Sequence, residues 1–301
     1  IWYTLGLRAH HWRISGADLE TTNNRTFSFR GQFAMKPNWE RDFIFRFATG
    51  IYAQPPSYKE LRNTEGTLNP EVDSQKSVHY ILGAEANFKL WNRPFKLESD
   101  LYYKHLSDLN AYTLDNVRIR YRADNVTDGY AMGFDLRLFG EFVPGTMSWM
   151  SIGLLKTMEN IDNQGSISRP IDQRFKFALL FQDYIPNIPN VRMYLNLVYN
   201  SGLPGGSPTH SSPYDYQYRL NAYKRADIGI HYVLKDGDSS TGLPWLKSFK
   251  TFTVGLEIFN MFDVRNTTTT TWVRDVYSKR FYGVPNYMTP RIFNVKLKLK
   301  L

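Results

Sequence analysis

The chain has 301 residues, of which 42% are hydrophobic and 16% aromatic, with no cysteine and a net charge of +9. The absence of cysteine excludes disulfides and thiolate metal sites. No stretch approaches the roughly 18 consecutive apolar residues of a membrane-spanning helix. No signal peptide precedes the strand-like residues that follow Ile1, as expected for a fragment cut within a fold.

Apolar and polar residues alternate with a period of two along much of the chain. In "DFIFRFATGIY", Phe43, Phe45, Phe47 and Ile51 share one face. The same pattern holds in "FKLESDLYYK", "GYAMGFDLRLFGEF", "VRMYLNLVYN" and "FTVGLEIF", and in the tail "TPRIFNVKLKLKL", which sets lysines against leucines. A period of two predicts β-strands with one apolar and one polar face.

The pattern predicts twelve strands and no amphipathic helix. They lie near residues 1–14, 25–36, 42–53, 77–91, 95–106, 127–142, 147–158, 172–184, 190–201, 217–234, 249–262 and 289–301. Tight turns such as "KPNWER", "NRP", "VPGT" and "IPNIPN" alternate with long loops at 15–24, 54–76, 107–126, 159–171, 202–216 and 263–288. The link at 235–248 is of intermediate length and falls on the side of the tight turns.

Short turns at one end and long loops at the other are typical of an outer-membrane barrel. The tryptophans also gather towards the two ends: Trp2, Trp39, Trp91, Trp149 and Trp245 towards the short turns, and Trp12 and Trp272 towards the long loops. We therefore expect two aromatic belts at the bilayer interfaces, with these tryptophans in them. A soluble β-sandwich would not hide so much charge on its second face. The predicted fold class is all-β, a transmembrane antiparallel β-barrel.

Five segments, in order, resemble the C-terminal half of the barrel of TonB-dependent outer-membrane receptors. They are "FATGIYAQPPSYKELR" (47–62), "GAEANFKLWNRPFKLESDLYYKHLSDL" (83–109), "GYAMGFDLRL" (129–138), "VGLEIFNMFDVRN" (254–266) and "YMTPRIFNVKLKLKL" (287–301). The chain differs from the family in ending on Leu301 rather than on an aromatic residue, and it has no counterpart of the plug domain or the TonB-contacting box. The resemblance implies that residues 1–301 form the C-terminal portion of one barrel domain of about 22 strands.

The candidate site residues fall into two groups. Binding groups concentrate on loops held by rigid scaffolds, and the loop candidates for ligand binding are Tyr214, Tyr216, Trp272, Arg274 and Tyr277. The lumen-facing charges are expected to contact the plug: Glu98, Asp100, Asp135, Arg137, Arg192, Glu257 and Lys296. The segment "NTTTTTW" (266–272) has high β-propensity and is expected to extend a hairpin beyond the membrane.

Other chemistry has less support. His105 and Ser107 lie on one strand face, as in outer-membrane phospholipases, but no acyl-transfer context surrounds them, and we expect no enzymatic activity. The histidines are dispersed, so no metal site or cofactor is expected. Nothing resembles a nucleic-acid or nucleotide module.

The expected function is TonB-dependent active import of a scarce nutrient across the bacterial outer membrane, with the C-terminus periplasmic. The resemblance implies the chain's own plug domain, the TonB energy-transducing complex, outer-membrane lipid and an unknown small ligand as partners, and it allows a surface-exposed accessory lipoprotein. The alternative is a self-contained 12-stranded pore or an outer-membrane lipase. The substrate, whether iron chelate, vitamin, glycan or peptide, stays open.

Overall fold

The computed structural model describes residues 1–301 except 17–18, 116–117, 186–187, 206–211, 216–217 and 238–243. β-strands make up most of the regular structure, and the helix among the described residues is the short 3-10 segment η1 (Pro244–Ser248). No described helix is long and apolar enough to cross a membrane. The predicted all-β class is confirmed.

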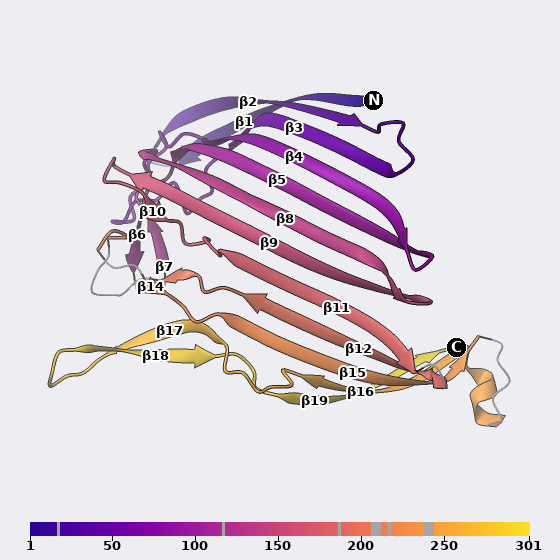
Figure 1. The fold of residues 1–301 in the computed structure, drawn as a ribbon. Coiled ribbons are helices and arrows are strands. Elements are labelled where there is room, and N and C mark those ends of the chain that lie inside the picture. The colour runs from indigo at the N-terminus through magenta and orange to yellow at the C-terminus, as the bar shows by residue number, and fades with distance from the viewer. Residues whose placement is uncertain (17–18, 116–117, 186–187, 206–211, 216–217, 238–243) are drawn as a thin grey trace.

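Twelve antiparallel strands form one continuous sheet in the order β1-β2-β3-β4-β5-β8-β9-β11-β12-β15-β16-β19, and β10 (Ile167–Ser168) pairs beside β9 (Figure 1). Their bounds are β1 Trp2–Gly16, β2 Leu19–Met35, β3 Asp42–Gln54, β4 Gln75–Leu90, β5 Arg93–Leu109, β8 Thr127–Val143, β9 Thr146–Ile161, β11 Phe175–Ile185, β12 Ile188–Asn200, β15 Tyr223–Asp236, β16 Thr251–Phe259 and β19 Ile292–Lys300. Each corresponds to one of the twelve strands predicted from alternation.

The connections differ in length at the two ends of the sheet. Short turns and both chain termini lie at one end, and the long loops lie at the other (Figure 1). The long loops carry small hairpins of their own: β6 (Tyr112–Asp115) with β7 (Arg118–Tyr121), β13 (Pro204–Gly205) with β14 (Tyr218–Arg219), and β17 (Thr267–Arg274) with β18 (Phe281–Tyr287). The last of these confirms the hairpin expected from "NTTTTTW".

One predicted loop is mostly strand. β1 continues to Gly16 and β2 begins at Leu19, so the described residues of the expected loop at 15–24 belong to two paired strands. "HHWRI" (10–14) pairs with "TNNRT" (22–26). The polar sequence at 15–24 predicted a loop. Threonine has a high β-propensity, however, and pairing with β1 completes the backbone hydrogen bonds of β2.

Strand pairing places the apolar residues on one face of the sheet. Phe47 pairs with Leu82, Leu82 with Leu101, and Leu101 with Phe134, and these side chains share a face because paired residues point the same way. Leu82 is 59% exposed and Leu101 57%. An apolar surface of this extent is untenable in water and is suited to lipid.

The polar face lies on the concave side of the sheet. Side chains that alternate with the apolar row, such as Arg46 and Asp100, form ion pairs there. The polar-face residues Glu159 and Ile161 of β9 are buried under the long loops, which fold into this side (Figure 1). The facing expected from alternation is confirmed.

The apolar face carries aromatic belts made mainly of phenylalanine and tyrosine, not of tryptophan. At the short-turn end, Phe88, Phe95, Phe142 and Phe181 form a chain of ring contacts with centroids 5.0–6.4 Å apart. Towards the long loops, ring contacts join Tyr103 to Tyr130 and Phe175 to Tyr199. On β5, Phe95 and Tyr103 are separated by about 27 Å of strand, or about 20 Å of membrane depth at a tilt of ~40°.

The expected aromatic belts are present, but the expected place of the tryptophans in them is wrong for several of these residues. Trp2, Trp12 and Trp149 stand in polar-face rows, because they pair with Ala34, Asn24 and Leu180. Trp39 and Trp91 do lie in turns at the short-turn end and are exposed, whereas the side chain of Trp245 lies outside the described part of the chain. Trp272 lies on β17, beyond the main sheet. Chain position alone did not show on which face each ring lies.

Two glycines of the polar face lie under tyrosine rings of the neighbouring strand. A Cβ on Gly133 would lie 2.4 Å from the hydroxyl of its pairing partner Tyr102. A Cβ on Gly229 would lie 2.1 Å from the ring of its partner Tyr194. Any side chain at these glycines would lift the rings, which now lie along the wall.

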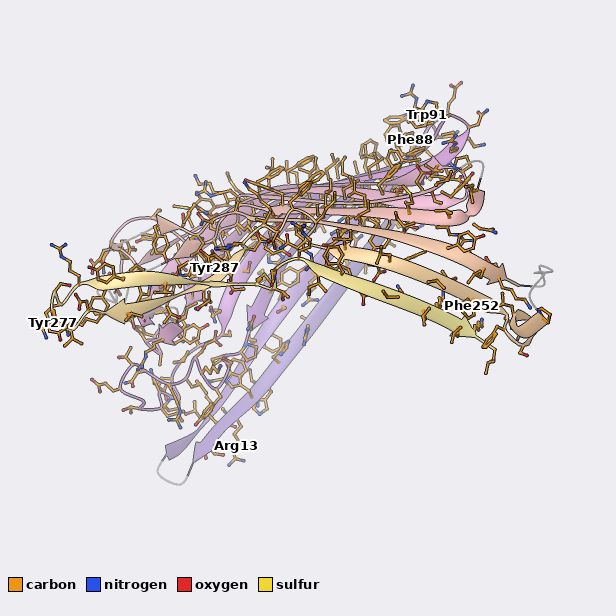
Figure 2. The ribbon with its side chains drawn as sticks, turned by 90° about the horizontal axis from the view of Figure 1, so that it is seen from below. Arg13, Phe88, Trp91, Phe252, Tyr277 and Tyr287 are labelled. Carbon is orange, nitrogen blue, oxygen red and sulfur yellow. The ribbon has the colours of Figure 1, made fainter. Side chains whose placement is uncertain are left out.

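The sheet is an open arch. β1 pairs with β2 and β19 pairs with β16, and no pairing joins β1 to β19 among the described residues. Seen from below, Arg13 and Tyr277 mark the long-loop end, and Trp91 and Phe252 mark the short-turn end (Figure 2). Both edge strands leave backbone N–H and C=O groups without a partner strand.

The facing makes a testable prediction about assembly. Leu136 lies midway between Tyr130 and Phe142 on the apolar face, so Leu136→Arg should cost about 2–4 kcal/mol at the membrane midplane. The control is Leu155→Arg, the same change on the polar face of β9, opposite Gly133. We expect heat-modifiable barrel to be lost in the first variant of the full-length protein and retained in the second. Equal yields would contradict the assigned facing.

Candidate functional site

Loops at the long-loop end fold into a mouth layer, which we define as residues 55–74, 110–115, 118–126, 162–174, 201–205, 212–215 and 218–222. The layer packs around two small hydrophobic cores. The first contains Ala111, Tyr112, Ile161 and Ile167, with Tyr121 and Tyr214 packed against it. The second contains Leu61, Val72 and Ala123, with Ile14 and Leu68 packed against it. The mouth layer is thus packed like a domain interior.

Polar contacts join its loops to one another. Asn110 Nδ2 donates to the carbonyl of Glu60 at 2.7 Å, and Asn69 Nδ2 donates to the carbonyl of Ala123 at 2.8 Å. The Glu60 carboxylate accepts from the Ser57 N–H at 2.6 Å. Loops far apart in the sequence therefore hold each other in place.

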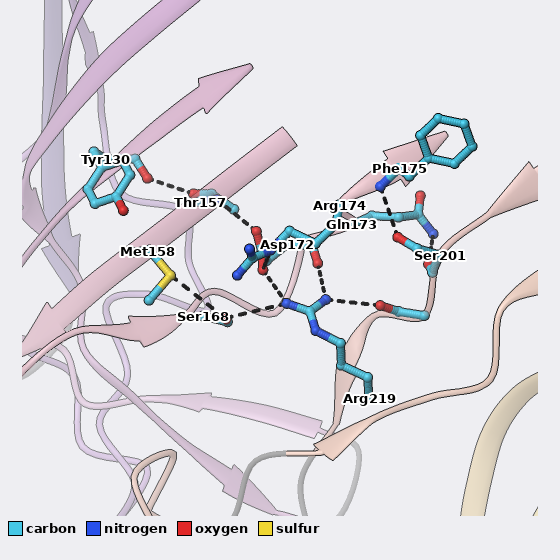
Figure 3. A network of polar contacts seen from close by, with 11 residues as sticks. Tyr130, Thr157, Met158, Ser168, Asp172, Gln173, Arg174, Phe175, Ser201 and Arg219 are labelled. Carbon is cyan, nitrogen blue, oxygen red and sulfur yellow. Dashed lines mark hydrogen bonds and ion pairs between the residues drawn. The ribbon is translucent and has the colours of Figure 1, made fainter. Parts of the chain in front are cut away.

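The buried carboxylate of Asp172 is the centre of a second network (Figure 3). It accepts from the Thr157 N–H at 2.8 Å and from Arg174 Nε at 2.6 Å, and it forms an ion pair with Arg219. Arg219 also donates to the carbonyls of Asp172 at 2.6 Å and Gly202 at 3.0 Å. One carboxylate thereby ties the loop after β10 to β9 and to the loop after β12.

Glu159, at the end of β9, makes a matching contact on the next loop. Its buried carboxylate accepts from the Tyr112 hydroxyl and from Arg169 Nε at 3.1 Å. Burial and the adjacent Glu159 charge raise the pKa of Tyr112 well above its usual value. Tyr112 therefore stays a neutral hydrogen-bond donor that fixes β6 to the wall.

The polar face below the mouth layer is lined by charged side chains. Glu257 is within 3.1 Å of His231, 3.5 Å of Lys296 and 2.8 Å of Asn294. Arg192 pairs with Asp236 at 3.2 Å. Most of this wall is thus a lattice of cross-strand ion pairs.

The predicted lumen residues all lie on this face. Cross-strand pairing sets Glu98 opposite Arg137 and Asp100 opposite Asp135. Arg192, Glu257 and Lys296 occupy the same face of β12, β16 and β19. Their expected contact with a plug stays a prediction.

The predicted loop residues do not converge on one point. The hydroxyl of Tyr214 donates to the carbonyls of Ile161 and Gly165, at 3.2 and 2.8 Å, so it holds two loops together. Tyr277 is 95% exposed at the tip of the β17–β18 hairpin, far along the molecule (Figure 2). Tyr216 lies outside the described residues.

Trp272 and Arg274 lie on the same hairpin. Arg274 lies over the ring of Phe281 at 5.7 Å, whereas the indole N–H of Trp272 is buried without a partner. His105 faces the apolar side of β5 at Tyr130. Within the described residues, no three His, Asp or Glu side chains lie close enough to hold a metal ion.

Sequence reasoning did not identify the mouth network. "RPIDQRF" gives no sign that Asp172 is buried, because Arg174 is a partner within the stretch but Thr157 and Arg219 come from β9 and from a distant loop. Arg30, a lumen-facing cation on β2, could have been predicted, since "FSFR" alternates and places Arg30 on the face opposite to Phe27 and Phe29.

Comparison with known proteins places this geometry in a class. No family model matches the sequence, and no curated protein matches it. Solved structures do match. The ferric-catecholate import receptor Fiu from Escherichia coli K12 aligns over 97% of this chain and 41% of its own, at 14% identity and a TM-score of 0.64.

Two further structures agree. The siderophore receptor PiuA from Acinetobacter baumannii aligns over 98% of this chain and 40% of its own, at 15% identity and a TM-score of 0.63. The copper transporter OprC aligns over 98% and 45%, at 12% identity and a TM-score of 0.66. The chain thus spans less than half of each of these three proteins. Its fold is that of part of a TonB-dependent outer-membrane receptor barrel, which confirms the resemblance at the level of fold.

The Asp172 network makes a pH-dependent prediction. Burial alone would raise the pKa of the Asp172 carboxyl, but the Thr157 N–H, Arg174 and Arg219 outweigh it and lower that pKa. A lowered pKa stabilises the loops above the unfolded value near 4 and loses that effect as the pH falls through the lower folded value. Protection of the Thr157 amide against hydrogen exchange, corrected for intrinsic rates, should therefore weaken only in acid.

The matched variants are Asp172→Asn and Asp215→Asn, an exposed aspartate of the same layer. Loss of charge-assisted hydrogen bonds costs about 1–3 kcal/mol, so exchange at Thr157 should speed up by roughly 10- to 100-fold in the first variant only. An equal rate in both variants at neutral pH would show that the network does not hold the loops.

Proposed function

We propose that this chain forms the second half of an outer-membrane receptor barrel that imports a scarce nutrient, driven by the TonB complex of the inner membrane. The open arch is the observation that supports the proposal, because the sheet has an apolar outer face and a charged inner face. It aligns with 40–45% of the length of each of the three solved transport proteins. A wall with two unpaired edges requires further strands. In lipid, each unsatisfied backbone group costs several kcal/mol.

About ten further strands would complete a barrel of about 22. They and a plug would precede this chain in one polypeptide, with residues 1–301 as the C-terminal portion of the barrel domain. The short turns would face the periplasm, as barrel turns do, and so would the C-terminus at the same end.

The mouth layer and the charged wall would have different roles in import. The mouth layer would capture the solute outside the cell, with Tyr214 positioning its loops and the β17–β18 hairpin presenting Trp272, Arg274 and Tyr277. The charged wall would hold the plug until the TonB complex displaces it. The chain itself would perform no catalysis and require no cofactor, and a surface lipoprotein would be an additional partner.

Import is tested with the full-length protein in a Gram-negative host. Labelled iron chelate, vitamin, glycan and peptide are offered to starved cells, with and without the energy-transducing complex. We expect accumulation of one class, lost without the complex. Accumulation that persists without it would identify a passive pore instead.

The half-barrel assignment predicts the fate of residues 1–301 expressed alone. Without partner strands for β1 and β19, the fragment should aggregate or be degraded. Co-expression of the missing half should restore membrane insertion. A stable, monomeric, conducting 12-stranded barrel from the fragment would overturn this assignment.

A further inference from the structure

Four neighbouring strands place three basic side chains in one row on the polar face. Arg30 on β2 pairs with Gly50 on β3, Gly50 pairs with His79 on β4, and His79 pairs with Lys104 on β5. We call Arg30 and Lys104, with the imidazole of His79 between them, the cationic row. His79 lies four residues after Gln75, where β4 begins at the long loops, so the row lies near the long-loop end of the wall.

Aromatic rings hold these groups against the wall. The guanidinium of Arg30 lies 4.4 Å above the Tyr52 ring, which in turn stacks on His79 at 4.1 Å and 23°. Lys104 Nζ is 5.3 Å from the centre of the Tyr102 ring. Such contacts position a cation without neutralising its charge.

The same four-strand region is neutralised closer to the short-turn end. Arg46 pairs with Glu85 at 2.5 Å and with Asp100 at 3.6 Å. Lys96 pairs with Glu85 at 2.9 Å and with Glu98 at 2.6 Å. Every cation of this lower network thus has a carboxylate.

The cationic row has none. Among the described residues, no carboxylate forms an ion pair with Arg30 or Lys104. Both side chains are accessible on the concave side. A hollow of about 470 Å³ is lined by Lys104 and Arg46 as well as by Asp100 and Asp135. The two acids balance the two bases of this hollow, so the excess positive charge of the region lies at the Arg30 end of the row.

We propose that the cationic row binds a carboxylate group of the imported solute, with Tyr52 positioning Arg30 for it. Guanidinium pairs with carboxylate in a bidentate geometry, and the Tyr52 ring, which lies between Arg30 and His79, holds the guanidinium in place for that pairing. The inference deepens the proposed function and rests on it, because a solute reaches this wall only by entering the barrel.

The test uses the full-length protein, purified in detergent, with benzene-1,3,5-tricarboxylate as the probe and the neutral benzene-1,3,5-tricarboxamide as its match. Titration calorimetry at low salt should show binding of the carboxylate and much weaker binding of the amide. Arg30→Gln combined with Lys104→Gln should weaken carboxylate binding at least tenfold, because each charge-assisted hydrogen bond is worth a factor of about ten or more.

The control is Lys298→Gln, which removes a cation from the polar face of β19 near the short-turn end. It should leave the affinity unchanged, and thermal unfolding should confirm that all variants are folded. Equal binding of the two probes, or equal loss in variant and control, would overturn the assignment. A third result would also overturn it: the wild type does not bind the carboxylate, and the double variant has a lower Tm. That combination would mean that an acidic segment of the protein itself covers the row.

This result is separable from that of the import assay. Probe binding with no energised uptake would refute import while leaving the anion site. Energised uptake with no probe binding would refute the anion site alone.

Discussion

The hydrogen-bonding requirement of the backbone in lipid controls this structure. A strand that faces hydrocarbon has no water to bond with, so each of its N–H and C=O groups needs a neighbouring strand. Ten of the twelve strands of the main path have neighbours on both sides, and β1 and β19 do not. The apolar outer face, the long antiparallel registers and the need for further strands all follow from this single condition.

The charge of the inner wall changes along the strands, from the short turns to the long loops. In the first strands, acids and bases neutralise one another near the short turns, whereas the cationic row is left uncompensated closer to the outer loops. The mouth layer above is fixed by carboxylates that are themselves buried, Asp172 and Glu159. A solute would therefore meet ordered loops first, then a basic surface, then a neutral wall.

Alternation predicted the strands well because its cause is local. The pleat points successive side chains to opposite faces, and one face meets lipid while the other meets the polar interior. It gave the facing of Leu101 and Asp100 from sequence spacing alone. It failed for Trp2, Trp12 and Trp149, since nearness to a belt in sequence does not determine the face. It also missed Asp172, whose carboxylate is buried between Thr157 of β9, Arg174 of its own loop and Arg219 of the loop after β12. Contacts of that kind are set by the tertiary fold.

The tyrosine rings that lie over Gly133 and Gly229 have a mechanical consequence. A tyrosine ring that lies over a paired glycine would lose this contact if it rotated into the interior. The clearance of the interior at these rows is then fixed by the backbone, not by side-chain rotamers. Exchange of either glycine for a larger residue would therefore narrow the interior at its row.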